Sequence, residues 1–321
     1  MKLATIDLGT NTALLLIAEI SDDGTIKVLR DELRSPRMGR DVDAQRKISE
    51  QSFQRVKEVF FEYKTITEQF SVEKIIATGT SALRDAHNRD EFIARMFFET
   101  GIRIEILSGE EEALWTFRGA VSGIENLQEN VAVIDIGGGS TELSVGWRFE
   151  VEGLRRKISN HNPQIANLFA KSFDIGAVRI TEKFFPSLPP KQNEIVDART
   201  FILQQLSEIS PQQFLNSQLV GVAGTVTTLA LLDQRIDYFD VAKVSNYVLK
   251  IEAIEKHLQT LSTKTPQEIL SLTKAAEGRA DILFAGTLIL FETMKYFSWK
   301  EIVASERGLR YGIVLREFEK Q

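Results

Sequence analysis

The sequence predicts an α/β protein made of two similar domains, each with a mixed five-stranded sheet flanked by helices. The order of three strands, helix, strand, helix and strand occurs twice along the chain. Each copy opens with a strand that ends in an Asp followed by a glycine turn, Ile6–Thr10 in the first and Ile134–Gly138 in the second. Asp7 and Asp135 stand 128 residues apart. Since solenoid repeats span only about 20–50 residues, we interpret this period as a duplicated domain.

In the first domain, alternating or continuous apolar runs predict strands, and apolar residues at helical spacing predict the helices between them. Asp23-Gly24 is a hairpin signal between the second and third strands. The predicted strands are Leu3–Asp7, Ala13–Ile20, Thr25–Leu33, Ile75–Ala77 and Ile102–Leu107. The predicted helices are one marked by Phe53, Val56, Phe60, Tyr63 and Phe70, then Asp90–Glu99 and Gly109–Val121.

The second domain repeats this order. The predicted strands are Val131–Ile136, Glu142–Trp147, Phe149–Ile158, Leu219–Val222 and Glu301–Ala304. The predicted helices are Ile195–Ile209, Ile251–Leu261, one opened by the capping box Thr265–Glu268, Ala275–Phe297 and Glu306–Glu319. We therefore expect domains at residues 1–124 and 125–305 that face a central cleft with both openings. The closing helix, residues 306–321, would pack back on the first domain.

Composition excludes several classes of protein. The chain has 321 residues, is 43% hydrophobic and has a net charge of −6, so it is globular and lacks the basic balance of a nucleic-acid-binding protein. It contains no Cys, which excludes thiolate nucleophiles and zinc–thiolate sites. Its three His are too few for a His-rich metal cluster. The apolar run Ala13–Ala18 is shorter than the ~20 residues of a membrane helix. We expect a cytoplasmic protein that binds neither nucleic acid nor membrane.

The two glycine turns are candidate phosphate-binding loops. Glycine lets backbone N–H groups approach an anion, and hydroxyl side chains add donors. The turns comprise Gly9, Thr10, Asn11 and Thr12, and Gly137, Gly138, Gly139, Ser140 and Thr141. Asp7 and Asp135 precede them, where a carboxylate would hold Mg²⁺ against phosphate oxygens. The alternative reading of each turn is a tight hairpin without a ligand.

Three further segments carry polar groups at strand ends or helix starts. Gly224-Thr225 ends a strand and opens a helix, which suits either a phosphate or a helix cap beside a close packing point. Arg84 follows a buried strand and is either a phosphate ligand or a surface charge. Ser108 and Glu111 match a capping box, whereas Glu112 has no part in the cap. Glu112 is thus either a base that accepts a proton from water or part of a solvated acidic face.

Taken together, the chain resembles the exopolyphosphatase/guanosine pentaphosphate phosphohydrolase family of the actin–Hsp70–sugar-kinase superfamily. The resemblance covers nearly the whole chain, and the run D-I-G-G-G-S-T-E-L at 135–143 with S-G-x-E-E-A at 108–113 is the specific part. The other matching segments are Ile6–Thr12, Gly79-Thr80, Leu83-Arg84, Ile175–Arg179, Gly224-Thr225, Ser305, Gly308–Arg310 and Gly312. Thr10 and Thr12 stand where serines are commoner, and Tyr311 stands where the family usually has glutamate. The chain matches the short form of the family, with two ribonuclease-H-like (actin-like) domains.

The resemblance implies roles for the candidate residues. Glu112 would be the catalytic glutamate, and Asp135 and Glu142 an acidic pair that holds Mg²⁺. With Asp7 these two carboxylates form the expected metal site, for Mg²⁺ alone or with a monovalent cation. Asn11, Arg84 and the second glycine turn would bind phosphate. The family also makes a homodimer an expectation.

These roles predict hydrolysis of a terminal phosphoanhydride bond, with orthophosphate released from polyphosphate or guanosine pentaphosphate. Two alternatives stay open. An ATP-dependent kinase of the same superfamily would need an acceptor and would not release phosphate from polyphosphate alone. A non-catalytic actin-like protein would assemble into filaments with rising concentration, and the presence of Glu112, Asp135 and Glu142 together argues against it.

Overall fold

The computed structural model describes residues 1–40, 42–148 and 165–320. These residues divide into two compact units. Unit 1 consists of residues 1–122 and 307–320, and unit 2 of residues 123–148 and 165–306. The chain changes unit after Ser122 and after Glu306, beside the boundaries expected at residues 124 and 305.

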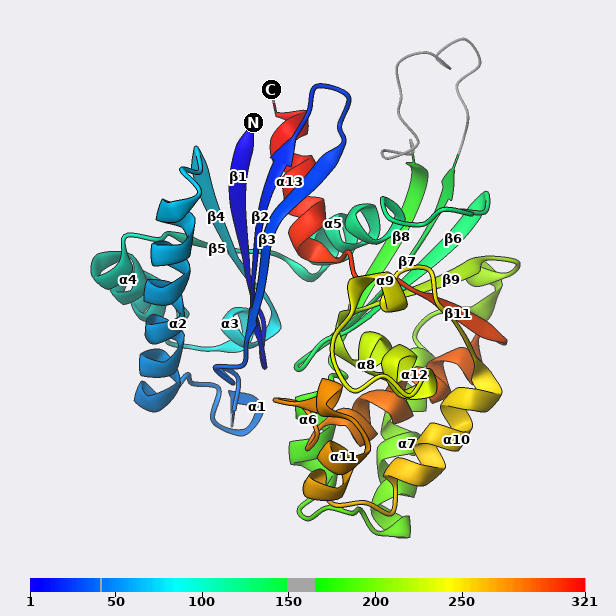
Figure 1. Ribbon diagram of the computed structural model, residues 1–321. Helices are drawn as coiled ribbons and strands as arrows, with labels where there is room; N and C mark the ends of the chain where they lie inside the picture. Colours follow the sequence, from blue (N-terminus) through cyan, green and yellow to red (C-terminus); the bar gives the residue numbers. More distant parts are fainter. Residues whose placement is uncertain (41, 149–164, 321) are drawn as a thin grey trace. The chain divides into compact units, whose positions relative to one another are not determined.

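Unit 1 is built on a mixed five-stranded sheet with the strand order β3-β2-β1-β4-β5 (Figure 1). The strands are β1 (Lys2–Leu8), β2 (Ala13–Ile20), β3 (Ile26–Arg34), β4 (Lys74–Gly79) and β5 (Ile104–Ile106). The first three form an antiparallel meander, and β1, β4 and β5 run parallel. Side chains alternate along β1, so that Ile6 and Leu8 join one buried cluster and Leu3 joins the other.

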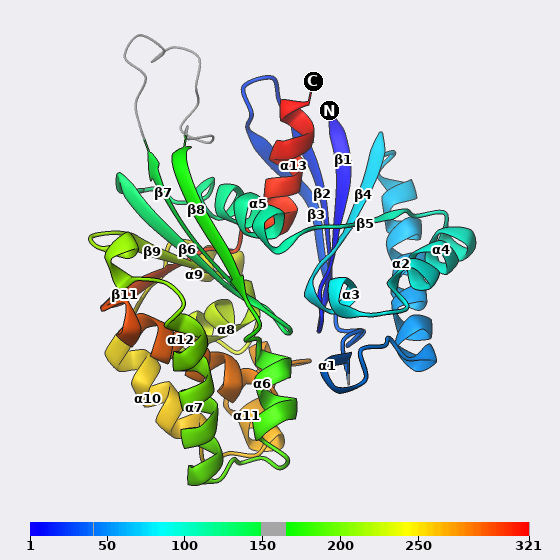
Figure 2. The ribbon, with the colours of Figure 1, turned by 180° about the vertical axis from the view of Figure 1, so that it is seen from behind.

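Different helices cover the two faces of this sheet (Figures 1 and 2). The helices of unit 1 are α1 (Val42–Gln45), α2 (Glu50–Gln69), α3 (Ser81–Asp85), α4 (Arg89–Thr100), α5 (Gly109–Val121) and α13 (Leu309–Glu319). On one face α2 packs with α4, where the rings of Phe53 and Phe92 meet edge to face at 5.5 Å. On the other face α13 lies against β1, β2 and α5.

Helices α5 and α13 meet backbone to backbone. A Cβ atom on Gly312 would lie 1.8 Å from the carbonyl oxygen of Trp115, and one on Gly119 would lie 2.1 Å from that of Gly308. Neither position can carry a side chain without separating the helices. The last helix of the chain therefore holds α5, the helix that carries Glu112.

Unit 2 contains a mixed six-stranded sheet with the strand order β10-β11-β9-β6-β7-β8. The strands are β6 (Asn130–Ile136), β7 (Thr141–Arg148), β8 (Ile165–Phe173), β9 (Gln218–Val222), β10 (Val248–Lys250) and β11 (Glu301–Ala304). Five of them repeat the order of unit 1, and β10 adds an antiparallel edge strand to β11 that the sequence did not predict. The predicted third strand, 149–158, lies outside the described residues, and β8 pairs with β7 in that place.

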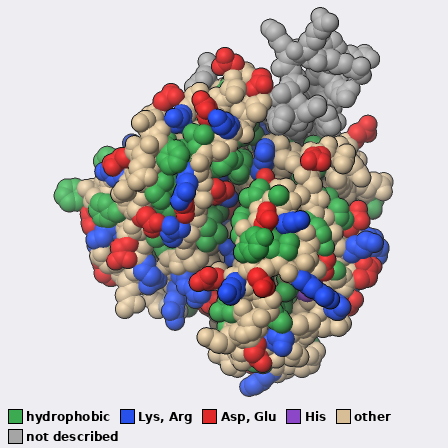
Figure 3. All heavy atoms as spheres, in the orientation of Figure 1, with side chains coloured by type: hydrophobic (Ala, Val, Ile, Leu, Met, Phe, Trp, Pro, Cys, Tyr) green, Lys and Arg blue, Asp and Glu red, His purple; other side chains and the backbone are tan. Residues whose placement is uncertain are grey.

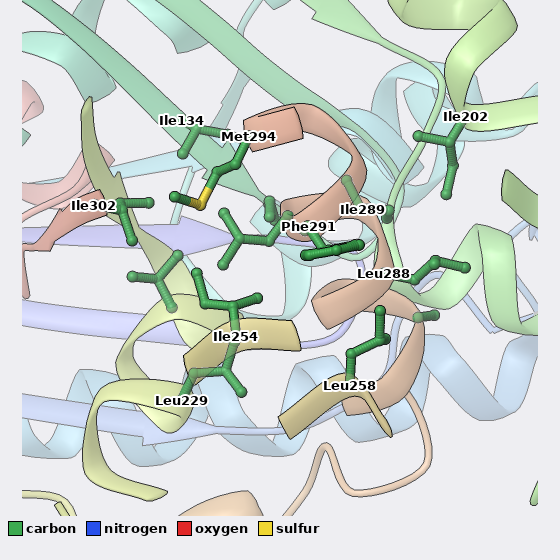
Figure 4. Close-up of a cluster of buried hydrophobic side chains, with 14 of the residues drawn as sticks. Ile134, Ile202, Leu229, Ile254, Leu258, Leu288, Ile289, Phe291, Met294 and Ile302 are labelled. Atoms are coloured by element: carbon green, nitrogen blue, oxygen red, sulfur yellow. The ribbon is translucent and has the colours of Figure 1, made fainter. Parts of the chain in front are cut away.

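The helices of unit 2 enclose one large apolar core. They are α6 (Ala177–Phe184), α7 (Gln192–Leu206), α8 (Ala223–Asp233), α9 (Val241–Val244), α10 (Ile251–Leu261), α11 (Pro266–Leu272) and α12 (Leu283–Tyr296), with 3-10 turns at Pro211–Phe214 and Lys274–Ala276. Side chains from α12 such as Leu288 and Met294 interdigitate there with Leu229 of α8, Ile254 of α10 and Ile134 of β6 (Figure 4). This core fixes the helices that follow the strands of the sheet.

The repeat and the capping boxes predicted from the sequence are confirmed, and two helix starts are wrong. Ser108 with Glu111 and Thr265 with Glu268 form capping boxes. The helix predicted from residue 275 begins at Leu283, because Gly278 has φ +76° and cannot continue a right-handed helix. The helix predicted from residue 306 begins at Leu309. Among the described residues, we find no helix with the length and apolar character to cross a membrane.

Candidate active site

The two glycine turns have the same backbone geometry. Each joins the first two strands of its unit and is closed by one hydrogen bond between its ends. The N–H of Gly9 donates to the carbonyl of Thr12 at 2.9 Å, and the N–H of Gly137 donates to that of Ser140 at 3.0 Å. The duplication inferred from the sequence thus extends to the hydrogen bonding of the turns.

The carbonyl groups of the second turn are held by the start of α6. The N–H of Ala177 donates to the carbonyl of Gly137 at 2.9 Å, and the Nε of Arg179 donates to that of Gly139 at 2.7 Å. In the described part of the chain, the N–H groups of Gly138 and Gly139 donate no hydrogen bond. The carbonyls are thus occupied while backbone donors remain, which is the arrangement that suits an anion.

The polar side chains of the turns, hydroxyl groups and the Asn11 amide alike, are buried or partly buried. Thr10 is 6% exposed, Asn11 9% and Ser140 2%. Thr141 donates its hydroxyl to the carbonyl of Ile175, so this side chain ties the second turn to the loop after β8. The hydroxyl proton of Thr141 is therefore already donated within the protein.

The two units differ in their acidic residues. In the β6–β7 ladder Asp135 stands directly opposite Glu142, so the two side chains share one face of the sheet. Glu142 is 2% exposed and accepts a 2.6 Å hydrogen bond from the hydroxyl of Ser172. In the equivalent ladder of unit 1, Asp7 stands opposite Leu14. A pair of carboxylates is therefore a property of unit 2.

Two carboxylates suit a Mg²⁺ ion that is also bound by substrate oxygens, and they are too few to hold it by protein side chains alone. Mg²⁺ commonly binds one or two carboxylates and completes its octahedral shell with phosphate oxygens and water. Asp135 and Glu142 supply two carboxylates on adjacent strands. Within residues 1–40, 42–148 and 165–320, no group of three or more His, Asp and Glu side chains could hold a metal. A metal here would depend on substrate oxygens for the rest of its shell.

Glu112 is held by Arg84 at the start of α5. Glu111 completes the capping box with Ser108, as predicted, and Glu112 next to it turns into the protein and is 7% exposed. The Nη1 of Arg84 donates to Oε2 of Glu112 and to the carbonyl of Leu107, both at 3.0 Å. Arg84 lies in the short helix α3 after β4, where the sequence predicted a loop. The structure thus joins two of the predicted site residues in one ion pair.

Gly224 and Thr225 lie at the first turn of α8. Ala223 before them has φ +63°, a left-handed conformation that is rare for a residue with a Cβ atom. A Cβ on Gly286 of α12 would lie 2.3 Å from Oγ1 of Thr225, so the hydroxyl faces the contact between α8 and α12. The Thr225 side chain therefore packs against α12, and the choice between a phosphate site and a helix cap at this segment stays a prediction.

Arg279 completes the surroundings of Gly224 and was missed in the sequence. A Cβ on Gly224 would lie 1.2 Å from Nη1 of Arg279, so the guanidinium occupies the space that the glycine leaves. Its Nε is buried and forms no hydrogen bond with the described residues. Burial lowers the pKa of Arg279 to about 10, so the side chain stays positively charged near neutral pH. A half-buried cation beside a helix start favours an anion at this place.

Comparison with known proteins places the chain in a family. The model of the Ppx/GppA phosphatase family matches residues 16–321. The chain belongs to this family. The predicted fold of two duplicated actin-like domains is confirmed by the two repeated sheets and by solved structures of the family. An exopolyphosphatase from Cytophaga hutchinsonii superposes with a TM-score of 0.86 at 26% identity and covers 100% of this chain and 98% of its own.

Two curated relatives match nearly the whole chain. Exopolyphosphatase 2 of Mycobacterium tuberculosis is 29% identical over 98% of this chain and 98% of its own length. The bifunctional 3-dehydroquinate synthase/phosphatase of Fusobacterium nucleatum is 33% identical over 99% of this chain. The chain spans 47% of the length of that Fusobacterium protein.

Proposed function

We propose that the chain hydrolyses the terminal phosphoanhydride bond of inorganic polyphosphate and releases orthophosphate. The observation that carries this proposal is the ion pair between Arg84 and Glu112 at a helix start, in a chain of the Ppx/GppA phosphatase family. The full-length relative named an exopolyphosphatase supports the choice of polyphosphate. Guanosine pentaphosphate, which also ends in a phosphoanhydride, is the second substrate to be tested.

Glu112 would act as the general base. A water attacks the terminal phosphorus, its new O–P bond forms as the bridging P–O bond breaks, and its proton passes to the carboxylate of Glu112. The shortened chain leaves with the bridging oxygen, and the released group is orthophosphate. The hydrogen bond from Arg84 holds the carboxylate in one orientation, which a base needs if it is to meet the attacking water.

The turns would bind the phosphate groups. The candidate donors are the main-chain N–H groups of Thr10 to Thr12, those of Gly138 to Thr141, and the first turn of α8 at Gly224 and Thr225. Gly9 and Gly137 would shape the turns, because their N–H groups close them. Arg279 supplies a fixed positive charge beside Gly224. When Mg²⁺ is bound at Asp135 and Glu142, it would neutralise charge on the phosphoryl oxygens. Together these groups would stabilise the negative charge on the oxygens of the transferred phosphoryl group in the transition state.

The test is a phosphate-release assay with long polyphosphate, tripolyphosphate and guanosine pentaphosphate, each with and without Mg²⁺. General-base catalysis is worth about 10²- to 10⁴-fold, so Glu112→Gln should lower kcat on that scale and keep the fold. Glu111→Gln is the matched control on the same helix turn. It removes the same charge from the capping box and should keep kcat while costing at most about 1 kcal/mol of stability.

One outcome would contradict the assigned reaction, and another would contradict the assigned base. If the unaltered chain released no phosphate from any of the three substrates, the assigned reaction would be wrong. If Glu112→Gln released phosphate as fast as the unaltered chain, the reaction could stand but the base would have to be another group.

A further inference from the structure

The loop after β3 carries two arginines next to the first glycine turn, and the proposed reaction does not use them. The N–H of Arg37 donates to the carbonyl of Asn11 at 3.0 Å, and the N–H of Gly39 donates to that of Thr10 at 2.8 Å. The main chain at residues 37–39 thus occupies two carbonyls of the turn. Arg40 follows directly and is exposed.

Other elements fix the same loop in place. From α2, Arg55 donates to the carbonyl of Pro36 at 2.6 Å and to that of Arg37 at 3.1 Å. Met38 is completely buried. A Cβ on Gly39 would lie 2.3 Å from the methyl carbon of Thr10, so the loop touches the turn directly. Arg55 of α2 therefore holds the loop from one side, the first glycine turn holds it from the other, and Met38 anchors it in the core.

Arg37 has a left-handed backbone with φ +51°. This conformation costs a residue with a Cβ atom about 1–2 kcal/mol and persists only where surrounding contacts enforce it. The two backbone hydrogen bonds and the bonds from Arg55 provide that enforcement. The result is that the Arg37 side chain, which is partly exposed, leaves the loop in a direction set by the fold.

The same place in unit 2 also carries an arginine, Arg179. There Gly176 lies against Gly138 as Gly39 lies against Thr10, so the two loops are equivalent in the repeat. Arg179 is 10% exposed at its side chain and donates to the carbonyl of Gly139. In unit 2 main-chain N–H groups and the side chain of Arg179 together hold the turn, and in unit 1 the main-chain N–H groups of Arg37 and Gly39 hold it.

We infer that Arg37 and Arg40 form a second phosphate subsite beside the first turn, for phosphate groups of the substrate that are not cleaved. The inference rests on the proposed function. Figure 3 shows Lys and Arg side chains gathered on the surface of unit 1 over α1, the helix that follows this loop. Guanidinium groups bind phosphate oxygens in pairs, and a local cluster lets a chain of net charge −6 hold a polyanion.

The ligand is a run of linked phosphates, either the continuing polyphosphate chain or the diphosphate of a nucleotide. The test measures binding of fluorescently labelled long polyphosphate by Glu112→Gln protein at several salt concentrations. Arg37→Asn and Arg40→Gln are added singly and together. Asn is chosen at position 37 because it tolerates the left-handed backbone. Lys27→Gln is the control, since Lys27 is exposed and pairs with Glu19 at the end of the strands remote from the turn.

Each arginine variant should raise the Kd for long polyphosphate about five- to tenfold and reduce the salt slope by about one, and Lys27→Gln should change neither. Thermal unfolding, measured for each variant, checks that all of them are folded at the temperature of the titration. Titration with unlabelled guanosine pentaphosphate identifies the source. An equal loss assigns the subsite to nucleotide phosphates as well, and a loss confined to the polymer assigns it to the chain.

An unchanged Kd and salt slope in the double variant would overturn the inference. This result is distinct from failure of the proposed function, which shows as absent phosphate release by the unaltered chain. The binding titration decides the subsite in either case.

Discussion

The ion pair between Arg84 and Glu112 predicts a measurable coupling energy. Four proteins are compared: the unaltered chain, Arg84→Gln, Glu112→Gln and the double variant. The free energy of unfolding of each gives the coupling as the departure from additivity. Arg84 also donates to the carbonyl of Leu107, but that bond is lost in both variants that lack Arg84 and so cancels in the cycle.

The structure sets the magnitude. Nη1 of Arg84 and Oε2 of Glu112 lie 3.0 Å apart, and their side chains are 23% and 9% exposed. Opposite charges about 4 Å apart attract by about 4 kcal/mol at an effective dielectric of 20, and removing both groups from water offsets part of this. We therefore expect a coupling of about 1.5–3 kcal/mol, the range of hydrogen bonds to charged groups.

The assay is denaturant unfolding followed by the fluorescence of Trp115, which lies on α5 one turn after Glu112. Replacing Trp147 and Trp299 by Phe in all four proteins confines the signal to unit 1, because both lie in unit 2. Arg84→Gln should be the less stable single variant, since the buried carboxylate then lacks the Arg84 charge. A coupling below about 0.5 kcal/mol would refute the view that Arg84 positions Glu112.

Two further predictions concern Arg279 and Glu317. Arg279→Met should raise the free energy of unfolding by about 1–3 kcal/mol, because it removes a half-buried cation, and should abolish thermal stabilisation by polyphosphate. Unchanged stabilisation by the ligand would show that Arg279 does not bind phosphate. Burial raises the pKa of Glu317, but hydrogen bonds from Lys320 and Lys74 outweigh it and lower the pKa to about 2. Stability should therefore fall by about 1–2 kcal/mol as pH drops from 4.5 to 2, and Glu317→Gln should remove this loss in acid titrations. An equally steep decline in Glu317→Gln would assign the loss to other carboxyl groups.

Features encoded within a short segment were predictable. The glycine turns, the capping box at Ser108 and the alternation of apolar residues along β1 each depend on neighbours in the chain. The repeat supplied the strand order, because a duplicated domain repeats its topology. The strand β8 was missed, since neither set of alternate residues in Ile165–Phe173 is wholly apolar. The edge strand β10 has three residues, too few for a periodic signal.

Site features that depend on tertiary contact were not predictable. Arg279 precedes α12 by a few residues and shows no pattern, and only the fold brings it to Gly224. The pairing of Arg84 with Glu112 likewise joins two helices that are separated by α4. The register between Asp135 and Glu142 is an intermediate case. A four-residue turn between two strands determines it, so the sequence contained the information needed to place both on one face.

The return of α13 to unit 1 has a consequence for biosynthesis. The first 122 residues leave the ribosome without the helix that packs on β1, β2 and α5. The whole of unit 2 must be translated first, which takes roughly 10–40 s at 5–20 residues per second. During that time the apolar side chains of Leu3 and Leu16 lack their cover, so the nascent chain is a target for chaperones that bind exposed apolar surface. Glu112, the proposed base, would then reach its final position only after α13 has emerged.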